Sequence, residues 1–213
     1  MEVLRIGYDP DFAPITFADG RGDADGTAIR RLAAACAAAG IDCRFVPVAL
    51  AEQARRLADG SVDALAAIGA TPARRRQLDL SRVYLTTGAA WFAPAPFDPS
   101  AASPAARIAT PVDGPLAAVV SARWPHLHVV AVAGYAQALS AVAEGRAAAA
   151  ALNIDVGTAM CAARFPGAFQ VPDRPFLTIG LALAWGASAD AATRRRLSQF
   201  LGKAREGAAG RAT

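Results

Sequence analysis

The sequence predicts an α/β protein built from two lobes, and three patterns in its 213 residues predict this fold. Short apolar segments alternate with helical segments, which is typical of parallel sheets covered by helices. This alternation occurs twice, and a stretch rich in proline, alanine and serine separates the two runs at 94–104. Two extended segments, near Tyr84–Gly88 and Leu177–Gly180, lie where the chain would cross between lobes. We therefore expect two lobes, each a mostly parallel sheet flanked by helices, joined by a two-strand hinge.

The elements of the first run follow from apolar spacing and from the residues that end each segment. Leu4–Tyr8 alternates as a strand does, and Thr27–Ala39 has one apolar face and ends at a glycine. Strand Cys43–Val48, helix Ala51–Ala58 and strand Val62–Ile68 complete this run, and an Asp-Gly pair closes the second helix. The layout is β-loop-αβ-αβ.

The second run repeats the alternation with short connections. Its expected segments are the strands Arg107–Thr110, His128–Val132, Ala147–Leu152 and Phe176–Trp185 and the helices Leu116–Arg123, Tyr135–Ala143, Asp155–Ala163 and Ala189–Arg205. The segment Ala89–Ala93, before the proline-rich stretch, is apolar. With the two crossings, lobe 1 is expected to hold residues 1–86 and 180–213, and lobe 2 to hold residues 87–179.

Composition narrows the class of protein. Hydrophobic residues make up 54% and charged residues 19%, which is typical of a folded domain and not of a disordered chain. The net charge is +4, but the arginines are dispersed without interleaved aromatics, so we expect no nucleic-acid partner. The triplets Arg74–Arg76 and Arg194–Arg196 are expected to be solvated helix faces.

No apolar run is long enough to span a bilayer. The start of the chain lacks a signal-peptide layout, so the protein is either cytosolic or lacks its leader here.

The stretch from Ala66 to Ser81 is the first candidate site. An apolar strand ends at Gly69, a Thr-Pro pair opens a helical turn, and Arg74 lies on that turn. Small residues leave backbone exposed beside the guanidinium, and amide groups at a helix start together with an arginine can bind a carboxylate. The alternative is an ordinary loop whose arginines are solvated.

The loop after the first strand is the second candidate site. Its sequence, D-P-D-F-A-P, contains two prolines that favour an irregular, extended loop. Loops at the carboxyl ends of strands bind ligands in open α/β sheets, so Asp9 and Phe12 are candidate contacts. A turn-capping aspartate and a core phenylalanine are the alternatives.

Cysteines and histidines leave alternatives open. Cys36 and Cys43 flank a turn between a helix and a strand, and this spacing allows either a disulfide or buried free thiols. Cys161 has no evident partner. His126 and His128 form an H-x-H pair that could bind a metal, but surface histidines are favoured because no acidic or cysteine ligand lies nearby. We expect no cofactor.

These residues resemble the type II periplasmic solute-binding proteins of ABC transporters, in the family that binds polar amino acids. The resemblance rests on L-R-I-G-Y-D-P-D-F-A-P-I-T-F, on A-D-G-S-V-D-A-L-A-A-I-G-A-T-P-A-R-R-R-Q-L-D-L-S, and on A-V-A-E-G-R-A-A-A-A-A-L-N-I-D-V. It covers nearly the whole chain, from Leu4 to about Arg205. It implies the type II periplasmic binding protein fold. The spacing of Cys36 and Cys43 also matches a disulfide of the subgroup that binds histidine, lysine and arginine, which implies an oxidising, periplasmic location.

The resemblance also implies a ligand site. Arg74 would bind the ligand's carboxylate in a bidentate pair, Asp9 would face its distal end, and Phe12 would stack against it. The full set of ligand-binding residues that it implies is Asp9, Phe12, Leu50, Ala67, Ile68, Gly69, Arg74, Asp113, Gly114, Asn153 and Asp155.

Several of these positions depart from the family pattern. Gly69 stands where a Ser or Thr is usual, and Leu50 stands where a second aromatic often stacks. Asp113-Gly114-Pro115 replaces a loop that normally supplies a hydroxyl and an amide. Asn153 aligns with the aspartate that binds the ligand's ammonium group. Asp113 or Asp155 could supply that charge, so the amine end of the ligand is left open.

The resemblance implies a non-catalytic, monomeric binding protein that closes two lobes over a small carboxylate-bearing solute and delivers it to a membrane permease. An enzyme similar to cyclohexadienyl or prephenate dehydratase is the first alternative, and it needs a carboxyl group of tuned pKa in the cleft. The ligand-sensing domain of a larger receptor is the second alternative.

Overall fold

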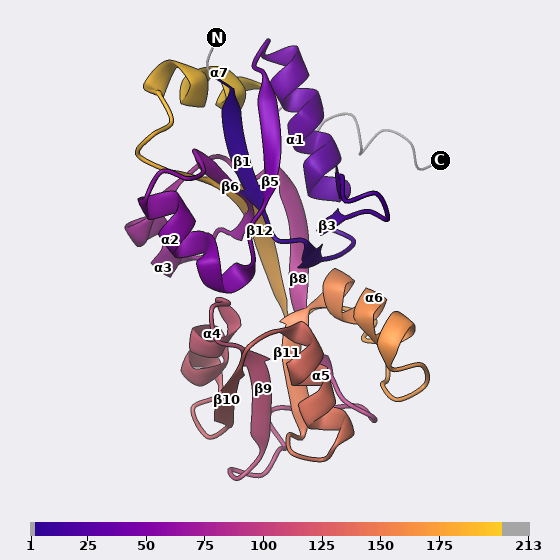
Figure 1. Cartoon of the computed structure of the whole chain (residues 1–213). Coiled ribbons are helices and arrows are strands. Elements are labelled where there is room, and N and C mark those ends of the chain that lie inside the picture. The colour runs from indigo at the N-terminus through magenta and orange to yellow at the C-terminus, as the bar shows by residue number, and fades with distance from the viewer. Residues whose placement is uncertain (1–2, 202–213) are drawn as a thin grey trace, which may run out of the picture. The chain divides into compact units, whose positions relative to one another are not determined.

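The computed structural model describes residues 3–201 of the chain (Figure 1). The chain divides into two compact units, with unit 1 holding the residues up to Thr86 and from Ile179 onward, and unit 2 holding Thr87–Thr178. Strands β8 (Leu85–Phe92) and β12 (Leu177–Trp185) each contain residues of both units. No helix within residues 3–201 is long and apolar enough to cross a membrane.

Unit 1 is built on a mixed sheet whose central strands are parallel. Strand β1 (Leu4–Tyr8) pairs in parallel with β5 (Cys43–Pro47) on one side and with β6 (Ala64–Gly69) on the other. Strand β12 runs antiparallel to β6, and the short strand β7 (Asp79–Leu80) runs antiparallel to β12. The buried face of β6 and its neighbours packs as one apolar cluster that includes Val48, Val62 and Leu65.

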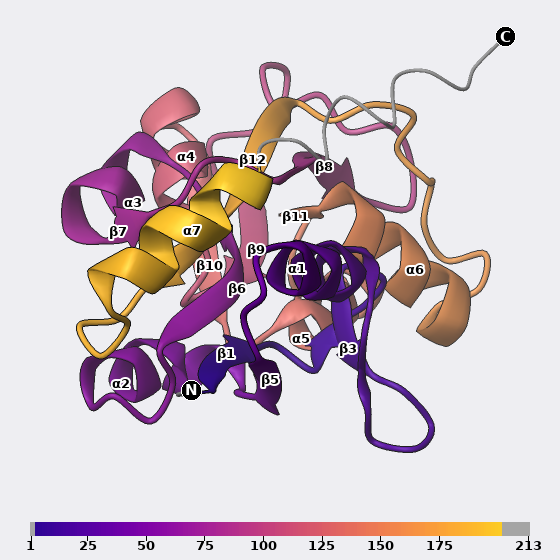
Figure 2. The ribbon, with the colours of Figure 1, turned by 90° about the horizontal axis from the view of Figure 1, so that it is seen from above.

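The helices of unit 1 cover this sheet. They are α1 (Thr27–Ala38), the 3₁₀ turn η1 (Leu50–Glu52), α2 (Gln53–Ala58), α3 (Pro72–Gln77) and α7 (Ala191–Leu201). Helix α1 buries Ile29, Leu32 and Cys36, whose helical spacing predicted one apolar face. Helices α1 and α7 pack against each other (Figure 2). The final helix was expected to extend to Arg205, and the residues after Leu201 lie outside the described part of the chain.

Unit 2 repeats the parallel arrangement. Its strands β9 (Arg107–Pro111), β10 (His128–Val132) and β11 (Ala149–Asn153) are parallel in the order β10-β9-β11, and β8 pairs antiparallel with β11. Its helices are α4 (Leu116–Arg123), α5 (Tyr135–Ala143) and α6 (Ile154–Arg164). Gly157 lets α6 approach the sheet, because a Cβ atom there would lie 2.3 Å from the Phe92 ring. Trp91 stacks on Phe176 at 4.5 Å between ring centroids and anchors a second apolar cluster.

The loop after β1 is more regular than the prolines predicted. Asp11–Phe12 forms the short strand β2, which pairs with β3 (Thr16–Ala18), and β3 pairs in turn with β4 (Ala24–Asp25). The expectation of an irregular loop was wrong because the prolines flank the two paired residues and leave their hydrogen-bonding groups available.

Cys36 and Cys43 form a disulfide, so the pairing implied by the family resemblance is present. It joins the end of α1 to the start of β5. Cys161 is a free cysteine and lies buried in another apolar cluster of unit 2, which contains Phe92 and Leu139.

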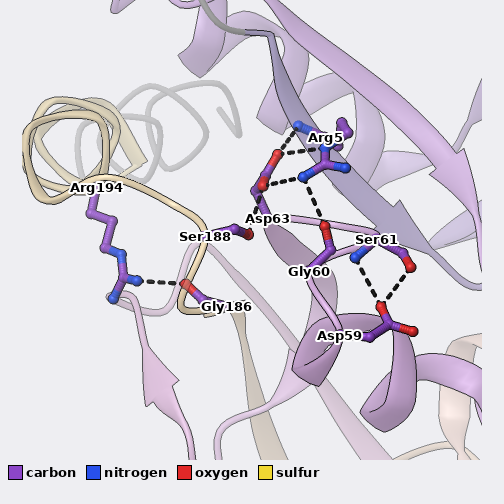
Figure 3. A network of polar contacts seen from close by, with 8 residues as sticks. All are labelled: Arg5, Asp59, Gly60, Ser61, Asp63, Gly186, Ser188 and Arg194. Atoms are coloured by element: carbon purple, nitrogen blue, oxygen red, sulfur yellow. Dashed lines mark hydrogen bonds and ion pairs between the residues drawn. The ribbon is translucent and has the colours of Figure 1, made fainter.

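A polar network joins the start of β6 to two other parts of unit 1 (Figure 3). The Asp63 carboxylate accepts hydrogen bonds from the Arg5 amide at 2.8 Å, from the Arg5 guanidinium at 2.7 and 3.0 Å, and from the Ser188 hydroxyl at 2.7 Å. Burial by itself would raise the pKa of Asp63, but these hydrogen bonds outweigh burial and hold the pKa below its ordinary value. Asp63 therefore remains a carboxylate that ties β1 to the loop between β12 and α7.

Arg194 is less solvated than the sequence predicted. Its guanidinium donates to the Asp79 carboxylate at 2.6 Å and to the carbonyls of Gly186 and Ala189 (Figure 3 shows the bond to Gly186). The expectation of a solvated Arg194 was wrong because the β12–α7 loop folds back and presents its carbonyls to this helix.

We predict that the unreduced, denatured protein contains one reactive thiol out of three cysteines, because Cys36 and Cys43 are joined. A thiol-reagent assay, repeated after reduction to expose all three thiols, measures this. Three reactive thiols before reduction would contradict the disulfide.

We predict that Asp63→Asn lowers the free energy of unfolding by about 2 kcal/mol at pH 7, since the neutral amide cannot replace a carboxylate that accepts charged hydrogen bonds. The pKa of Asp63 is lowered in the folded state, so its stabilisation is complete above about pH 4 and is lost as the pH falls through the folded-state pKa. Urea unfolding at pH 7 and pH 3 measures the difference.

The matched control is Asp23→Asn, which changes an exposed carboxylate in the turn before β4. It should leave stability unchanged at both pH values. A loss for Asp63→Asn that is the same at pH 3 and at pH 7 would show that the carboxylate charge is not the stabilising feature.

Candidate functional site

The predicted ligand-binding residues fall into two groups, one in each unit. In unit 1, Asp9 follows β1, Leu50 begins the turn after β5, and Gly69 ends β6. These three strands are parallel, so their carboxyl ends lie at one edge of the sheet, where α/β proteins bind ligands. The sheet topology thus brings together residues that are far apart in the sequence.

Asp9 is held by its own loop. Its carboxylate accepts a hydrogen bond from the Asp11 amide at 3.0 Å, and its carbonyl accepts one from the Thr16 hydroxyl at 2.7 Å. Burial raises the pKa of Asp9, the hydrogen bond from Asp11 lowers it, and the charge of Asp11 raises it again, with a net increase. Phe12 lies on β2 and is half-buried. The turn-capping alternative is therefore present at one carboxylate oxygen of Asp9, and a ligand contact of Asp9 remains a prediction.

Strand β6 changes conformation before it ends. Ala67 has a φ of +56°, and it is the only non-glycine residue with positive φ within residues 3–201. Its amide donates to the phenol oxygen of Tyr84 at 2.8 Å. Ile68 and Gly69 follow and are both buried. Tyr84 was not selected from the sequence, because an isolated tyrosine before a strand carries no signal of its role.

Arg74 lies on α3 two residues after Pro72, which occupies the first position of that helix. Thr71 caps the helix, and its hydroxyl accepts a hydrogen bond from the Arg74 amide at 3.3 Å. That amide is therefore used inside the chain, and the guanidinium of Arg74, the predicted anion-binding group of this turn, is half-buried. The neighbouring Arg75 and Arg76 are exposed, as expected of a solvated helix face.

In unit 2, Asn153 ends β11 and caps α6. Its side-chain oxygen accepts hydrogen bonds from the amides of Asp155 and Val156 at 3.0 and 3.2 Å, and its side-chain amide donates to the Thr87 hydroxyl at 3.0 Å. The Thr87 hydroxyl in turn donates to the Asp155 carboxylate. Asn153 is buried, so its amide serves helix capping, whereas Asp155 is exposed and carries the charge of this group.

The remaining predicted residues of unit 2 follow β9. Asp113 is exposed in the turn before α4, and the Gly114 amide donates to the Pro111 carbonyl at 3.2 Å. Near the same strand end, the Thr110 hydroxyl is buried and has no hydrogen-bond partner within residues 3–201. Thr110 is a polar group that sequence reasoning missed, because it lies inside an apolar strand pattern.

Each unit also has a surface hollow that lies away from its predicted ligand-binding residues. The hollow of unit 1 measures about 490 Å³ and is lined by Asp79–Arg82, Trp185 and α7, and that of unit 2 measures about 400 Å³ and is lined by the Trp91 and Phe176 segments. None of the predicted ligand-binding residues lines either hollow. We assign the candidate site by strand ends and chemistry rather than by these volumes.

Comparison with known proteins identifies the family. The sequence model of the bacterial extracellular solute-binding proteins, family 3, matches residues 4–206, which confirms the resemblance drawn from the motifs. No curated protein matches the chain.

Solved structures match almost the whole chain. A histidine kinase sensor domain with similarity to periplasmic binding proteins is 22% identical with a TM-score of 0.84, over 98% of this chain and 92% of that one. An ancestral amino acid-binding protein, a precursor of cyclohexadienyl dehydratase, is 22% identical with a TM-score of 0.76, over 97% and 91%. A periplasmic His/Glu/Gln/Arg/opine family-binding protein from Silicibacter pomeroyi in complex with lysine is 21% identical with a TM-score of 0.78, over 97% and 92%.

At these identities the likeness concerns the fold. It confirms the predicted α/β fold of the two-lobed periplasmic binding proteins. The ligand-binding roles of individual residues remain predictions.

We predict that Ala67→Gly is neutral or stabilises unit 1 by up to about 1 kcal/mol, because glycine adopts positive φ without the strain that alanine carries. Ala66→Gly is the matched control, since Ala66 is a buried neighbour on β6 with ordinary φ. That control should lose about 1 kcal/mol. Urea denaturation measures both, and equal losses would contradict the strain at Ala67.

Proposed function

We propose, because the chain belongs to the bacterial extracellular solute-binding proteins of family 3, that it binds a small carboxylate-bearing solute such as an amino acid. The loaded protein delivers the solute to the membrane permease of an ABC transporter. The protein acts as a non-catalytic monomer and needs no cofactor. The observation that carries the proposal is the position of Arg74 on α3, directly after the strand whose carboxyl end carries Gly69.

Arg74 binds the carboxylate of the solute. A guanidinium presents paired N–H groups whose spacing matches two carboxylate oxygens, so one planar contact supplies both charge and orientation. The backbone of Ala67, Ile68 and Gly69 lines the same end of the solute. Asp9 faces the distal end, where a cationic group would compensate the carboxylate that burial otherwise disfavours.

The amine end of the solute is recognised differently from the family pattern. Both functional groups of the Asn153 side chain are used inside unit 2, so it offers an ammonium group no charge and little hydrogen-bonding capacity. Asp155, which lies two residues later and is held by Thr87, is the nearer source of negative charge. The loop of Asp113 and Gly114 is a further part of the proposed binding site, and Leu50 offers the solute an apolar side chain.

The disulfide supports an oxidising location, and we place the protein in the periplasm. A disulfide between Cys36 and Cys43 would be rare in the reducing cytoplasm of ordinary bacteria. The pairing also agrees with a family whose members are extracellular.

A carboxyl group with a raised pKa favours one second candidate, a dehydratase similar to cyclohexadienyl or prephenate dehydratase. Asp9 is such a group, and a general acid needs a pKa shifted toward neutrality. Binding without catalysis is the stronger proposal, because the family is one of solute-binding proteins.

We predict that L-lysine, L-arginine, L-histidine or L-glutamine raises the melting temperature of the protein. A ligand at a hundred times its Kd stabilises a protein by about 2.7 kcal/mol, which is a shift of several degrees in a thermal-shift assay. Cadaverine, which lacks the carboxylate of lysine, should give no shift. 6-Aminohexanoate, which lacks only the α-amino group, should retain part of the shift.

Arg74→Ala should weaken binding of the shifting amino acid about 100-fold or more, because one partner of a charged pair is lost. Arg75→Ala is the matched control on the same helix, and it should bind as the unaltered protein does. Equal affinity for Arg74→Ala would remove Arg74 from the site. Turnover of prephenate would assign the protein to the dehydratases instead.

A further inference from the structure

The pairing of β6 with β12 contains a bulge, and Ala67 lies in it. Leu65 pairs with Ala184 and Ile68 pairs with Ala182, so two residues of β6, Ala66 and Ala67, oppose a single residue of β12. A bulge of this kind interrupts the regular ladder of hydrogen bonds and redirects the strand after it. Here the redirected residues are Ile68 and Gly69, which precede the turn to α3.

At the interruption the ladder no longer supplies the partner of one backbone amide, that of Ala67. The Ala67 amide donates instead to the phenol oxygen of Tyr84 at 2.8 Å. The amide of Leu183, the residue opposite the bulge, faces away from β6 and donates to the hydroxyl of Ser81 at 2.9 Å, on the side where the Leu183 carbonyl accepts from the Ser81 amide. Both hydroxyl groups come from one short segment, and both side chains are buried. Buried amides without acceptors destabilise a structure, so the Tyr84 phenol stabilises the bulged conformation of β6, and Ser81 fixes the same segment on β12.

The segment from Ser81 to Tyr84 is itself hydrogen-bonded to β12 and to α1. The Ser81 amide donates to the Leu183 carbonyl and the Tyr84 amide to the Leu181 carbonyl, both at 2.9 Å. The Tyr84 carbonyl accepts a hydrogen bond from the guanidinium of Arg31 on α1 at 2.6 Å. Burial raises the pKa of the Tyr84 phenol well above its ordinary value, although the Ala67 amide and the charge of Arg31 oppose this change. Tyr84 is thus a neutral acceptor at a fixed position.

The bulge is connected to Arg74 by a short bonded path. After Gly69, the Ala70 amide donates to the Gly180 carbonyl at 2.8 Å, and the Thr71 amide donates to the Gly69 carbonyl at 2.9 Å. Thr71 then caps α3. A change in the conformation of Ala67 would therefore move both Gly69 and the start of the helix that carries Arg74.

We propose that Tyr84 is a positioning residue for the ligand site of unit 1: its phenol holds the β6 bulge, and the bulge places Gly69 and Arg74 for the ligand's carboxylate. The identity of the ligand in this inference rests on the proposed function. The bulge and its bond to Tyr84 are features of the structure and do not depend on that function. Tyr84 acts through Ala67 and touches no ligand.

Tyr84→Phe tests the inference, because it removes the acceptor and keeps the buried ring. Hydrogen exchange of the ligand-free protein should show the amides of 66–70 exchanging about tenfold faster. Ser188→Ala is the matched control, since it removes a hydrogen bond to Asp63 at the opposite end of β6. It should lower stability without accelerating exchange at 66–70. Unchanged exchange in Tyr84→Phe would overturn the inference.

Affinity separates positioning from stability. With L-lysine and L-arginine as the probes in calorimetry, Tyr84→Phe should bind the recognised probe about tenfold more weakly, at a temperature where both proteins are folded. Ser188→Ala should bind normally. Adding Ala67→Gly to Tyr84→Phe should restore most of the affinity, because glycine keeps positive φ without the phenol. Full affinity in Tyr84→Phe, or no recovery in the double variant, would overturn the positioning role. If the unaltered protein binds neither probe while exchange at 66–70 responds as expected, the proposed ligand is contradicted and the bulge is not.

Discussion

Strand β6 is hydrogen-bonded on both sides in opposite senses, and the rest of unit 1 depends on this pairing. On one side it runs parallel to β1, which places Asp9 and Gly69 at the same sheet edge. On the other side it runs antiparallel to β12, with the bulge at Ala67. At its start, the Asp63 carboxylate ties it to Arg5 and Ser188. One strand therefore carries the main polar network and, a few residues later, the proposed carboxylate site.

The two ends of β6 differ in their physical character. At Asp63 a charge is buried and fully bonded, which is strongly stabilising only while the carboxylate is ionised. At Ala67 the backbone adopts a conformation that alanine disfavours, and a neutral phenol supports it. Strain of this kind persists where the surroundings impose it, and it is concentrated at functional sites. In unit 2, by contrast, Asn153 caps α6 at the end of β11 with an ordinary φ of −59°, and Asp155 carries the charge of that loop.

Much of the fold could be predicted from local sequence. Apolar spacing and terminating glycines located the helix Thr27–Ala38 and the strands β5, β9 and β10 to within a residue or two, because these signals act over one or two turns. The role of Arg194 was missed because its acceptors belong to a loop that returns from β12. The bonds of Asn153 were missed because its partner Thr87 lies on a distant strand.

The sequence by itself determined the α/β class, the family and the presence of an arginine on a short helix after a buried strand. These are properties of residue spacing and of motifs that each lie within a few dozen residues. Only the tertiary structure decided that β6 is bulged, that Tyr84 accepts its displaced Ala67 amide, and that Asn153 is used as a helix cap. The physical reason is that a register shift exists only between two strands, so neither strand's own sequence specifies which amides lose their partners.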